Sequence, residues 1–351
     1  THKVESELDA KDVRIGDWSG KKADMISGYV SWLKKTLPSL SRIVGPVYFD
    51  SMHGPGGAVF ERVVNKNKSV VFLRKDRDPL FGRTNPEPIE VNLQALKEAM
   101  ANRRGVIGVA VDGDGDRIGV IDEKGTYIPP HTVMPLILRH LVENRRLKGK
   151  VVQTVSMGYL PERLAAKHRL PFVEVPVGFK YISAHMKTGK VLLGGEESGG
   201  FGVGLWSAER DGLLCAGLLL ECLSKMKTTL SEQIQKLYDQ YGKSCFRRVD
   251  FHLDQPVDKA QWTQSLADLI GTTFAGEAIK KVNRMDGIKV VLGDDAWVLM
   301  RPSGTEPLIR TYSEAPSLSR VNDLLAETER LVRACLLYTS PSPRDRTRSR
   351  M

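Results

Sequence analysis

The stretch VIGVAVDGDGDRIGVI, residues 106–121, places three aspartates at alternating positions between two apolar runs that are typical of β-strands. Because the side chains of an extended chain alternate between its two sides, we expect Asp112, Asp114 and Asp116 to point the same way. Three crowded carboxylates repel one another unless a cation lies among them, and Mg²⁺ and Mn²⁺ prefer oxygen ligands. The stretch therefore predicts a Mg²⁺ site at the end of a strand, where open α/β sheets bind ligands.

Two other interpretations of the aspartates compete with this one. The first is a solvated acidic turn, since Asp and Gly are common in turns between strands. The second is an EF-hand calcium loop, because Glu123 stands at the twelfth position counted from Asp112. The sixth position, however, is Arg117 where that loop needs glycine, and the flanking segments resemble strands instead of helices. The pattern thus favours Mg²⁺ over calcium.

The composition is that of a soluble globular protein, with 351 residues, of which 41% are hydrophobic and 27% charged. This length predicts two or three domains. No run of about 18 apolar residues occurs, so we expect no transmembrane helix and no membrane partner. The four cysteines lack C-x-x-C spacing, which favours buried free thiols in a reducing compartment. We expect the cytoplasm or, as the alternative, an organelle stroma.

The formal net charge of +10 suits either a nucleic-acid binder or an enzyme for anionic substrates. The tail at residues 338–351 carries four arginines against one aspartate and has no apolar periodicity. We expect this tail to be disordered, whether or not it is native to the protein. Because no basic stripe is interleaved with aromatic residues, we expect no nucleic-acid partner.

Helical and strand-like periodicity alternate through most of the chain. The first series comprises helix 23–37, strand 42–50, strand 70–73, helix 92–100 and the strand that precedes Asp112. The second comprises helix 133–143, strand 150–155, helix 161–168, strands 172–176 and 191–194, and a buried apolar helix to residue 226 that Asp211 caps. Then come helix 230–241, strands 249–253, 287–292 and 296–300, and helix 318–337. This order predicts an α/β fold of two related, mostly parallel α/β sheet domains followed by a smaller α+β domain.

A loop at residues 301–305 combines the groups that bind phosphate. Arg301 offers a guanidinium fork, and Arg310 follows on the next predicted strand. Ser303 and Thr305 add hydroxyls, while Gly304 exposes backbone N–H groups. The alternative is a plain hairpin turn with a surface arginine.

A second polar loop, at residues 194–202, carries Glu196, Glu197 and Ser198 between glycines. Carboxylates beside a hydroxyl suit hydrogen bonds to the adjacent hydroxyls of a sugar. Lys180, close behind Gly178, is a candidate for a phosphate or sugar contact, although a single lysine is more often only solvated. The glycine-rich turn at 51–57 fits either an anion site or a plain β–α turn.

Four motifs stand in order along the chain: DGDGDR at 112–117, VGFKYI at 177–182, GGEESGG at 194–200 and RPSGTEP at 301–307. Together they resemble the α-D-phosphohexomutase superfamily, specifically its phosphoglucomutase/phosphomannomutase branch, over residues 12–335. The resemblance implies four domains in the intact protein, three of them related α/β domains. This chain would contain the second (12–126), the third (127–240) and the fourth (241–337), with residues 1–11 as a remnant of the first.

The resemblance also implies a role for each motif. Asp112, Asp114 and Asp116 would be the Mg²⁺ ligands, with Arg117 beside the metal. Glu196 and Ser198 would hold sugar hydroxyls. Gly178 and Lys180 would form a recognition loop, in which the lysine is a candidate acid/base or phosphate contact. The non-reacting phosphate of the substrate would be held by Arg301, Ser303, Gly304, Thr305 and Arg310.

The sequence departs from the family pattern at two places. A loop like T-A-S-H-N-P, which carries the family's phosphorylated serine in the first domain, does not occur in these residues. In addition, Trp206 lies where a histidine is common. We therefore expect a fragment that lacks the first domain, binds metal weakly and does not turn over alone.

For the intact protein the resemblance implies Mg²⁺-assisted intramolecular phosphoryl transfer between hexose 1-phosphate and hexose 6-phosphate, through a hexose 1,6-bisphosphate. The second glutamate of GEES favours glucose and mannose phosphates over glucosamine phosphates. We expect a monomer or a homodimer that acts in carbohydrate metabolism. A non-catalytic phosphosugar-binding protein is the alternative from another functional class.

Overall fold

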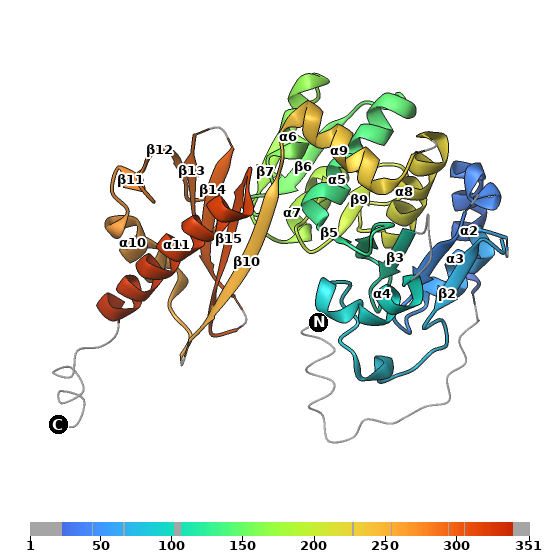
Figure 1. Ribbon diagram of the computed structural model, residues 1–351, viewed down its shortest axis with the longest axis horizontal. Coiled ribbons are helices and arrows are strands. Elements are labelled where there is room, and N and C mark those ends of the chain that lie inside the picture. The colour runs from blue at the N-terminus through green and yellow to red at the C-terminus, as the bar shows by residue number, and fades with distance from the viewer. Residues whose placement is uncertain are drawn as a thin grey trace.

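The computed structural model describes residues 23–339, except for residues 44, 66, 102–106, 227, 254, 294 and 305. In this part of the chain three β-sheets follow one another along the longest axis of the molecule, each with its own helices (Figure 1). The remnant expected at residues 1–11 and the tail from residue 340 onward lie outside the described residues. The order of the elements confirms the predicted fold class.

The first sheet has the strand order β2-β1-β3-β4-β5. β1 pairs in parallel with β2 and β3, while β4 and β5 extend the sheet in antiparallel fashion. Every residue of β1, β3 and β4 is buried, which explains their nearly continuous apolar sequence. The elements of this first α/β unit are β1 (Val47–Asp50), β2 (Val70–Leu73), β3 (Ile107–Val111), β4 (Ile118–Ile121), β5 (Tyr127–Ile128), α2 (Met25–Thr36), α3 (Gly56–Val63), α4 (Gln94–Met100) and the 3₁₀ turns η1 (Pro38–Arg42), η2 (Phe81–Arg83) and η3 (Glu90–Asn92).

The second sheet, with strand order β7-β6-β8-β9, repeats the topology of the first. In both sheets the first strand lies between the second and the third, and the fourth strand is an antiparallel neighbour of the third. The repeat that the sequence predicts is therefore present in the structure. The elements of this second α/β unit are β6 (Lys150–Thr154), β7 (Phe172–Val175), β8 (Val191–Gly195), β9 (Phe201–Val203), α5 (Pro130–Arg139), the π-helical turn η4 (His140–Asn144), α6 (Leu160–Lys167), α7 (Phe179–Met186), α8 (Gly212–Met226) and α9 (Leu230–Tyr241).

Helix α8 joins the two α/β units. It contacts β3 and β4 of the first sheet as well as α5 and β9 of the second unit. The leucines from Leu213 to Leu220 are buried, as expected for a helix segment that is apolar on all sides. Asp211 caps the helix as predicted, because its Oδ1 accepts a hydrogen bond of 2.8 Å from the Leu214 N–H.

The third sheet is antiparallel, with strand order β10-β15-β14-β13-β12-β11. One face packs on α10 and α11 through a core of its own. Trp297, Leu299 and Tyr312 on the opposite face join the core of the α/β units. The elements of this C-terminal domain are β10 (Cys245–His252), α10 (Lys259–Leu269), β11 (Thr273–Phe274), β12 (Glu277–Asn283), β13 (Ile288–Leu292), β14 (Ala296–Pro302), β15 (Leu308–Ala315) and α11 (Leu318–Thr339).

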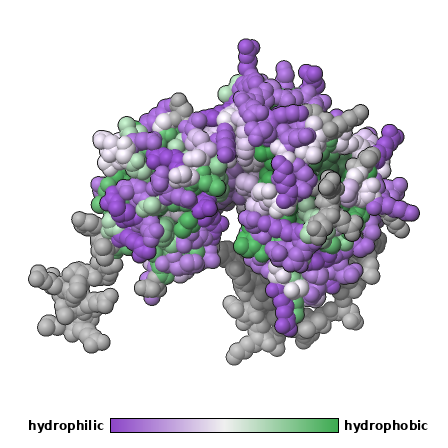
Figure 2. Space-filling view, in the orientation of Figure 1, coloured by the Kyte–Doolittle hydropathy of each residue, from purple (hydrophilic) through white to green (hydrophobic). Residues whose placement is uncertain are grey.

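The surface view is mostly hydrophilic on the side shown and is hollowed between the C-terminal domain and the α/β units (Figure 2). Within the described residues, no helix has the length and apolar character needed to cross a membrane. Cys215 and Cys222 are buried free thiols, as predicted, and Cys335 is buried as well. Cys245 is half-buried and free.

Several elements differ from the sequence-based expectation. Helices α7 and α10 and strand β12 were not expected, and α11 continues to Thr339, two residues into the predicted tail. Strand β12 is exposed along most of its length and rich in Lys and Glu, so it lacks the alternation that marks a half-buried strand. The strand expected at 42–50 begins only at Val47, because residues 38–42 form the turn η1.

A buried carboxylate connects the C-terminal domain to the second α/β unit. Glu314 on β15 is fully buried and accepts hydrogen bonds from the Trp297 indole (2.6 Å), the Tyr159 N–H (3.0 Å) and the Ser244 hydroxyl. Burial raises the pKa of Glu314, while these hydrogen bonds oppose the rise. The fit is close, since a Cβ added at Gly158 would lie 2.5 Å from Glu314 Oε1.

Replacement of Glu314 by alanine should destabilise the C-terminal domain by about 3 kcal/mol, because several buried donors would lose their acceptor. Differential scanning calorimetry measures this as a lower melting temperature. Glu329→Ala is the matched control: it removes a carboxylate of α11 that is 45% exposed and paired with Arg333, and should change stability by less than about 0.5 kcal/mol. Equal melting temperatures for Glu314→Ala and the wild type would contradict the structural role of this carboxylate.

Candidate active site

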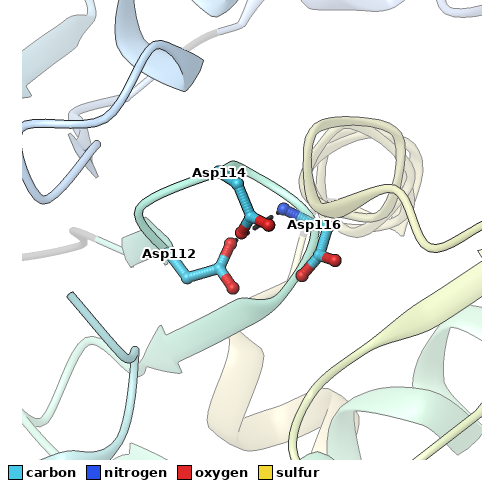
Figure 3. A group of neighbouring side chains, drawn as sticks. All are labelled: Asp112, Asp114 and Asp116. Carbon is cyan, nitrogen blue, oxygen red and sulfur yellow. Dashed lines mark hydrogen bonds between the residues drawn. The ribbon is translucent and has the colours of Figure 1, made fainter. Parts of the chain in front are cut away.

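The aspartate loop follows the end of β3 and turns back into β4. Carboxylate oxygens of Asp112, Asp114 and Asp116 all lie within 4.8 Å of one another, and the three side chains converge (Figure 3). The expected reason was wrong, however, because the segment is a tight turn and not an extended strand. Gly115 has a φ of +82°, which a glycine adopts without strain. The turn, and not strand alternation, brings the carboxylates together.

Asp112 is the best-anchored member of the loop. Its Oδ1 accepts from the backbone N–H groups of Asp116 (2.8 Å) and Arg117 (3.0 Å), and its Oδ2 accepts from Arg117 Nε (2.6 Å). Burial acts to raise the pKa of Asp112, but the hydrogen bonds and the charge of Arg117 outweigh it and lower this pKa. Arg117 is held in turn by Glu87, whose Oε1 lies 2.7 Å from Nη1. Asp112 is therefore an ionised anchor.

The other two aspartates are less stable in their ionised form than Asp112. Burial and the charge of Asp112 raise the pKa of Asp114, and the same causes raise that of Asp116 to about 7. Arg210 Nη2 lies 2.6 Å from Asp116 Oδ2 and opposes this rise only in part. A divalent cation would favour ionised carboxylates at this place, so three converging oxygen donors fit Mg²⁺.

The glycine-rich turn at 51–57 packs against the aspartate loop. A Cβ added at Gly54 would lie 2.5 Å from the Gly113 carbonyl oxygen, so the two backbones touch. His53 Nδ1 lies 2.9 Å from the carbonyl oxygen of Asp76, in the segment that follows β2. These contacts favour a structural β–α turn over an anion site.

The acidic loop at 194–202 packs directly on the aspartate loop. The Ile118 N–H donates to the Gly199 carbonyl (3.0 Å), and the Gly212 N–H donates to the Gly115 carbonyl (3.1 Å). Gly199 has a φ of +87°, and a Cβ there would lie 2.5 Å from the Ile118 carbonyl oxygen. Only glycine allows this approach, so the distance between the two loops is fixed by their backbones.

The two neighbouring glutamates of the acidic loop have different surroundings. Glu196 is 6% exposed, accepts a hydrogen bond from the Gly178 backbone and lies 3.8 Å from Arg210. Burial and the adjacent charge of Glu197 raise the pKa of Glu196 to about 7. Glu197 instead accepts hydrogen bonds from the hydroxyls of Thr154, Ser156 and Tyr312. Glu196 thus belongs to the site, whereas Glu197 joins the C-terminal domain.

Helix α7 presents the recognition loop of the second α/β unit. Gly178, with a φ of +129°, precedes the first helical residue, and Lys180 lies in the first turn. The Lys180 side chain is exposed, and its ammonium lies 5.0 Å from the Tyr181 ring centroid. Ser198 is half-buried in the adjacent acidic loop. Two polar side chains of the predicted sugar site are therefore solvent-accessible.

The predicted phosphate loop connects β14 and β15. Arg301 and Arg310 are direct partners across the hairpin, on the same sheet face as Trp297 and Tyr312. Like charges directly opposite one another are unfavourable unless an anion lies near them. Arg301 pairs with Asp286 (Nε to Oδ2, 3.1 Å) and Arg310 with the exposed Glu306 (2.7 Å).

The remaining residues of this loop complete the hairpin. Ser303 Oγ accepts the Glu306 N–H at 3.3 Å, and Gly304 is exposed with open space around its Cα. Thr305 lies outside the described residues. The loop therefore combines two arginines with an accessible backbone, which is the arrangement that phosphate groups bind.

An unbroken series of contacts connects all four motifs. It includes two residues that the sequence did not indicate, Arg210 and Asp286. A third, Glu87, lies outside the series and pairs with Arg117 of the first motif. A lone charged residue has no local pattern, and no signal in the sequence would have revealed them. The contacts run from Asp116 to Arg210, from Arg210 to Glu196, from Glu196 to Gly178, from Val177 to Asp286 and from Asp286 to Arg301.

Two repeated α/β units and an antiparallel C-terminal domain are what the resemblance to the phosphohexomutase class of proteins implies. Three family models match the chain: "Phosphoglucomutase/phosphomannomutase, alpha/beta/alpha domain II" over residues 28–125, domain III over residues 129–241, and the C-terminal domain over residues 258–331. The chain belongs to the phosphoglucomutase/phosphomannomutase family.

Known relatives carry more than one activity name. The chain is 27% identical to a phosphoglucomutase/phosphomannomutase of Thermococcus kodakarensis (92% of this chain, 69% of the relative) and 27% identical to a phosphoglucosamine mutase of Pseudomonas syringae (94% and 68%). It spans between 57% and 72% of the lengths of the relatives compared.

Solved structures share the fold. A phosphomannomutase-like protein from Thermus thermophilus is 31% identical with a TM-score of 0.77 (92% of this chain, 69% of the other). An N-acetylphosphoglucosamine mutase of Aspergillus fumigatus, solved with GlcNAc-6P and magnesium, is 17% identical with a TM-score of 0.61 (88% and 66%), which shows likeness of fold alone.

Replacement of Asp116 by asparagine should weaken Mn²⁺ or Mg²⁺ binding by at least about tenfold, because one anionic ligand is lost. In the wild type, the affinity for the metal ion should fall by about tenfold for each unit by which the pH is lowered below 7. The reason is that the pKa of Asp116 is raised to about 7, so a proton competes with the metal below that pH. Isothermal titration calorimetry between pH 6 and 8 measures both effects.

Asp239→Asn provides the control for total charge, since Asp239 is an exposed carboxylate on α9. It should leave metal affinity unchanged. Equal affinities for Asp116→Asn and the wild type would exclude Asp116 as a ligand.

Proposed function

We propose that this chain provides the metal, sugar and phosphate sites of a phosphohexomutase that interconverts hexose 1-phosphate and hexose 6-phosphate. The observation that carries the proposal is the unbroken series of contacts from Asp116 to Arg301, which links a cation site to a phosphate site through the loop of Glu196. Membership of the family supports it independently.

The proposed roles follow from position and charge. Arg301 and Arg310, with Ser303, Gly304 and Thr305, bind the phosphate that does not react. Glu196 and Ser198 hold adjacent sugar hydroxyls, and the raised pKa of Glu196 allows it to accept or donate a hydrogen bond near neutral pH. One phosphate site can serve both isomers, because the bisphosphate intermediate turns and exchanges its two ends.

The reacting phosphate is proposed to lie near the other end of the site. Asp112, Asp114 and Asp116 would hold Mg²⁺, which neutralises the charge of a phosphoryl group when it is bound. Arg117 is fixed by Asp112 and Glu87, so it orients the loop. Lys180 is the exposed cation available as proton donor or phosphate contact.

A serine-bearing domain has a surface on which to dock beside the aspartate loop. Met25 and Ile26 on α2 are 80% and 45% exposed, which is unusual for apolar side chains. With Pro55 and Val59 they border a cavity of about 250 Å³ that reaches Asp114. We propose that the phosphoserine domain packs there and brings its phosphoryl group to the metal site.

Glucose and mannose phosphates are the proposed substrates, on the basis of the second glutamate of GEES. Glu197 contacts hydroxyls of the protein, so its influence on sugar preference would act through the position of the loop. A coupled assay of the full-length gene product with glucose 1-phosphate, mannose 1-phosphate and glucosamine 1-phosphate tests this choice. Higher activity on glucosamine 1-phosphate would contradict it.

Residues 1–351 alone should bind hexose phosphates but show no mutase turnover, because these residues include no loop with the family's phosphoserine. Calorimetry with glucose 6-phosphate and a coupled assay of the same preparation measure the two properties. Turnover by this chain would overturn the expectation. If the full-length gene product also binds hexose phosphates but shows no mutase activity, the alternative is favoured, namely a non-catalytic phosphosugar-binding protein.

Replacement of Arg310 by methionine should weaken glucose 6-phosphate binding by roughly 10- to 100-fold, the usual effect of losing a charge-assisted hydrogen bond to phosphate. Methionine keeps most of the side-chain length, so the hairpin should remain folded. Arg330→Met, on the exposed side of α11, is the control and should bind normally. Unchanged affinity in Arg310→Met would remove this arginine from the phosphate site.

A further inference from the structure

We propose that Asp286 is a positioning residue that couples phosphate binding at Arg301 to the recognition loop of Gly178 and Lys180. The inference rests on the proposed function, since it assigns a new residue to that site. Asp286 lies between β12 and β13 and is only 6% exposed. Its place in the C-terminal domain lets it contact both the phosphate arginine and the second α/β unit.

One carboxylate oxygen of Asp286 serves both sides of the junction. Oδ2 accepts the Val177 N–H at 3.1 Å and lies 3.1 Å from Arg301 Nε. The other oxygen, Oδ1, pairs with Lys259 of α10. Because the same oxygen contacts Arg301 and Val177, a movement of Arg301 together with Asp286 changes the distance to Val177.

The backbone around Asp286 leaves little freedom for the carboxylate. Gly287 has a φ of +82°, and a Cβ there would lie 2.3 Å from the Met300 carbonyl oxygen and 2.6 Å from Arg301 Cβ. The turn is therefore pressed against the strand that carries Arg301. Asp286 keeps a fixed position relative to this arginine, and Val177 is the partner whose distance can change.

The charges around Arg301 make this position important. The Arg301 side chain is 10% exposed and faces Arg310 across the hairpin. The carboxylate of Asp286 offsets part of this repulsion by a charge–charge contact, since Arg301 Nε has no hydrogen-bond partner among the described residues. Without Asp286, Arg301 would lose this anionic partner.

The contact also reaches the sugar site. Val177 immediately precedes Gly178, whose backbone donates to Glu196, and Lys180 follows in α7. When phosphate binds Arg301 and restricts its motion, Asp286 and its hydrogen-bond partner Val177 are restricted as well. The residues that follow Val177 and face the sugar are then held in place. Recognition of phosphate and of sugar hydroxyls should be cooperative, and Asp286 should carry the coupling.

A purely structural link between the domains is the competing explanation. A second link exists at Asp295, between β13 and β14, whose carboxylate is 40% exposed and pairs with Arg163 of α6. Both Asp286 and Asp295 join the C-terminal domain to the second α/β unit, but only Asp286 contacts Arg301. Asp295→Asn is therefore the control for loss of an interdomain contact.

The test compares glucose 6-phosphate and inorganic phosphate as ligands of the full chain, by calorimetry and by amide NMR spectra of the recognition loop. In the wild type, inorganic phosphate should shift the amide signals of Val177 and Gly178. Asp286→Asn should weaken the binding of glucose 6-phosphate by about tenfold and abolish these amide shifts. Asp286→Glu, which keeps the charge, should restore a good part of the affinity, and Asp295→Asn should stay within about twofold of the wild type.

Loss of affinity and of amide shifts in Asp286→Asn, with both retained in Asp295→Asn, would support the coupling. Equal behaviour of the two asparagine variants, or wild-type amide shifts in Asp286→Asn, would overturn it. If the wild type binds inorganic phosphate with these shifts but not glucose 6-phosphate, the proposed function fails while the coupling stands. If Asp286→Asn does not fold, Asp286→Glu decides the question. A folded Asp286→Glu variant that retains the affinity for glucose 6-phosphate and the amide shifts supports the inference. A folded variant that shows neither overturns it.

Discussion

Like charges that the backbone holds close together are the constraint on which the whole site depends. The oxygens of three aspartates lie within 4.8 Å of one another, and Arg301 stands directly opposite Arg310. Burial disfavours the ionised forms of Asp114 and Asp116, and repulsion from Asp112 adds to this effect, so the pKa values of both carboxyls are raised. A cation would relieve the first group and an anion would relieve the second. Within the chain, Arg210 does so in part for the aspartates, and Asp286 and Glu306 do so in part for the arginines.

The junction between the second α/β unit and the C-terminal domain combines two kinds of contact. Trp297, Leu299 and Tyr312 pack into the shared apolar core, which holds the domains together without directional preference. Hydrogen-bonded carboxylates surround this contact and are directional: Glu197 binds the Tyr312 hydroxyl, Glu314 the Tyr159 N–H and Asp286 the Val177 N–H. Because these bonds depend on geometry, they determine how the arginine hairpin faces the loop of Glu196. The same polar contacts that orient the domains thus also orient the site.

Much of the fold could be predicted, because strong periodicity accompanies strong burial. The strand before Asp112 is apolar throughout and helix α8 is apolar up to Leu220, and both are where the sequence indicates. Strand β12 and helix α7 were missed because exposed strands and short helices have weak periodicity. The same limit applies to the site. Residues within contiguous motifs were predicted, whereas Arg210 and Asp286 stand alone in the sequence and acquire partners only when distant segments meet.

The sequence by itself determined which chemical groups are available, because residue types and short spacings are local properties. The sequence contains a carboxylate cluster, a Glu/Ser loop and an arginine loop, in an order along the chain that is typical of one family. Only the tertiary structure decided how these groups face one another. The turn at Gly115 makes the aspartates converge, and the packing separates Glu196, which faces the site, from Glu197, which binds the neighbouring domain. The physical reason is that burial and long-range partners set charge and orientation, and both arise only when remote parts of the chain are in contact.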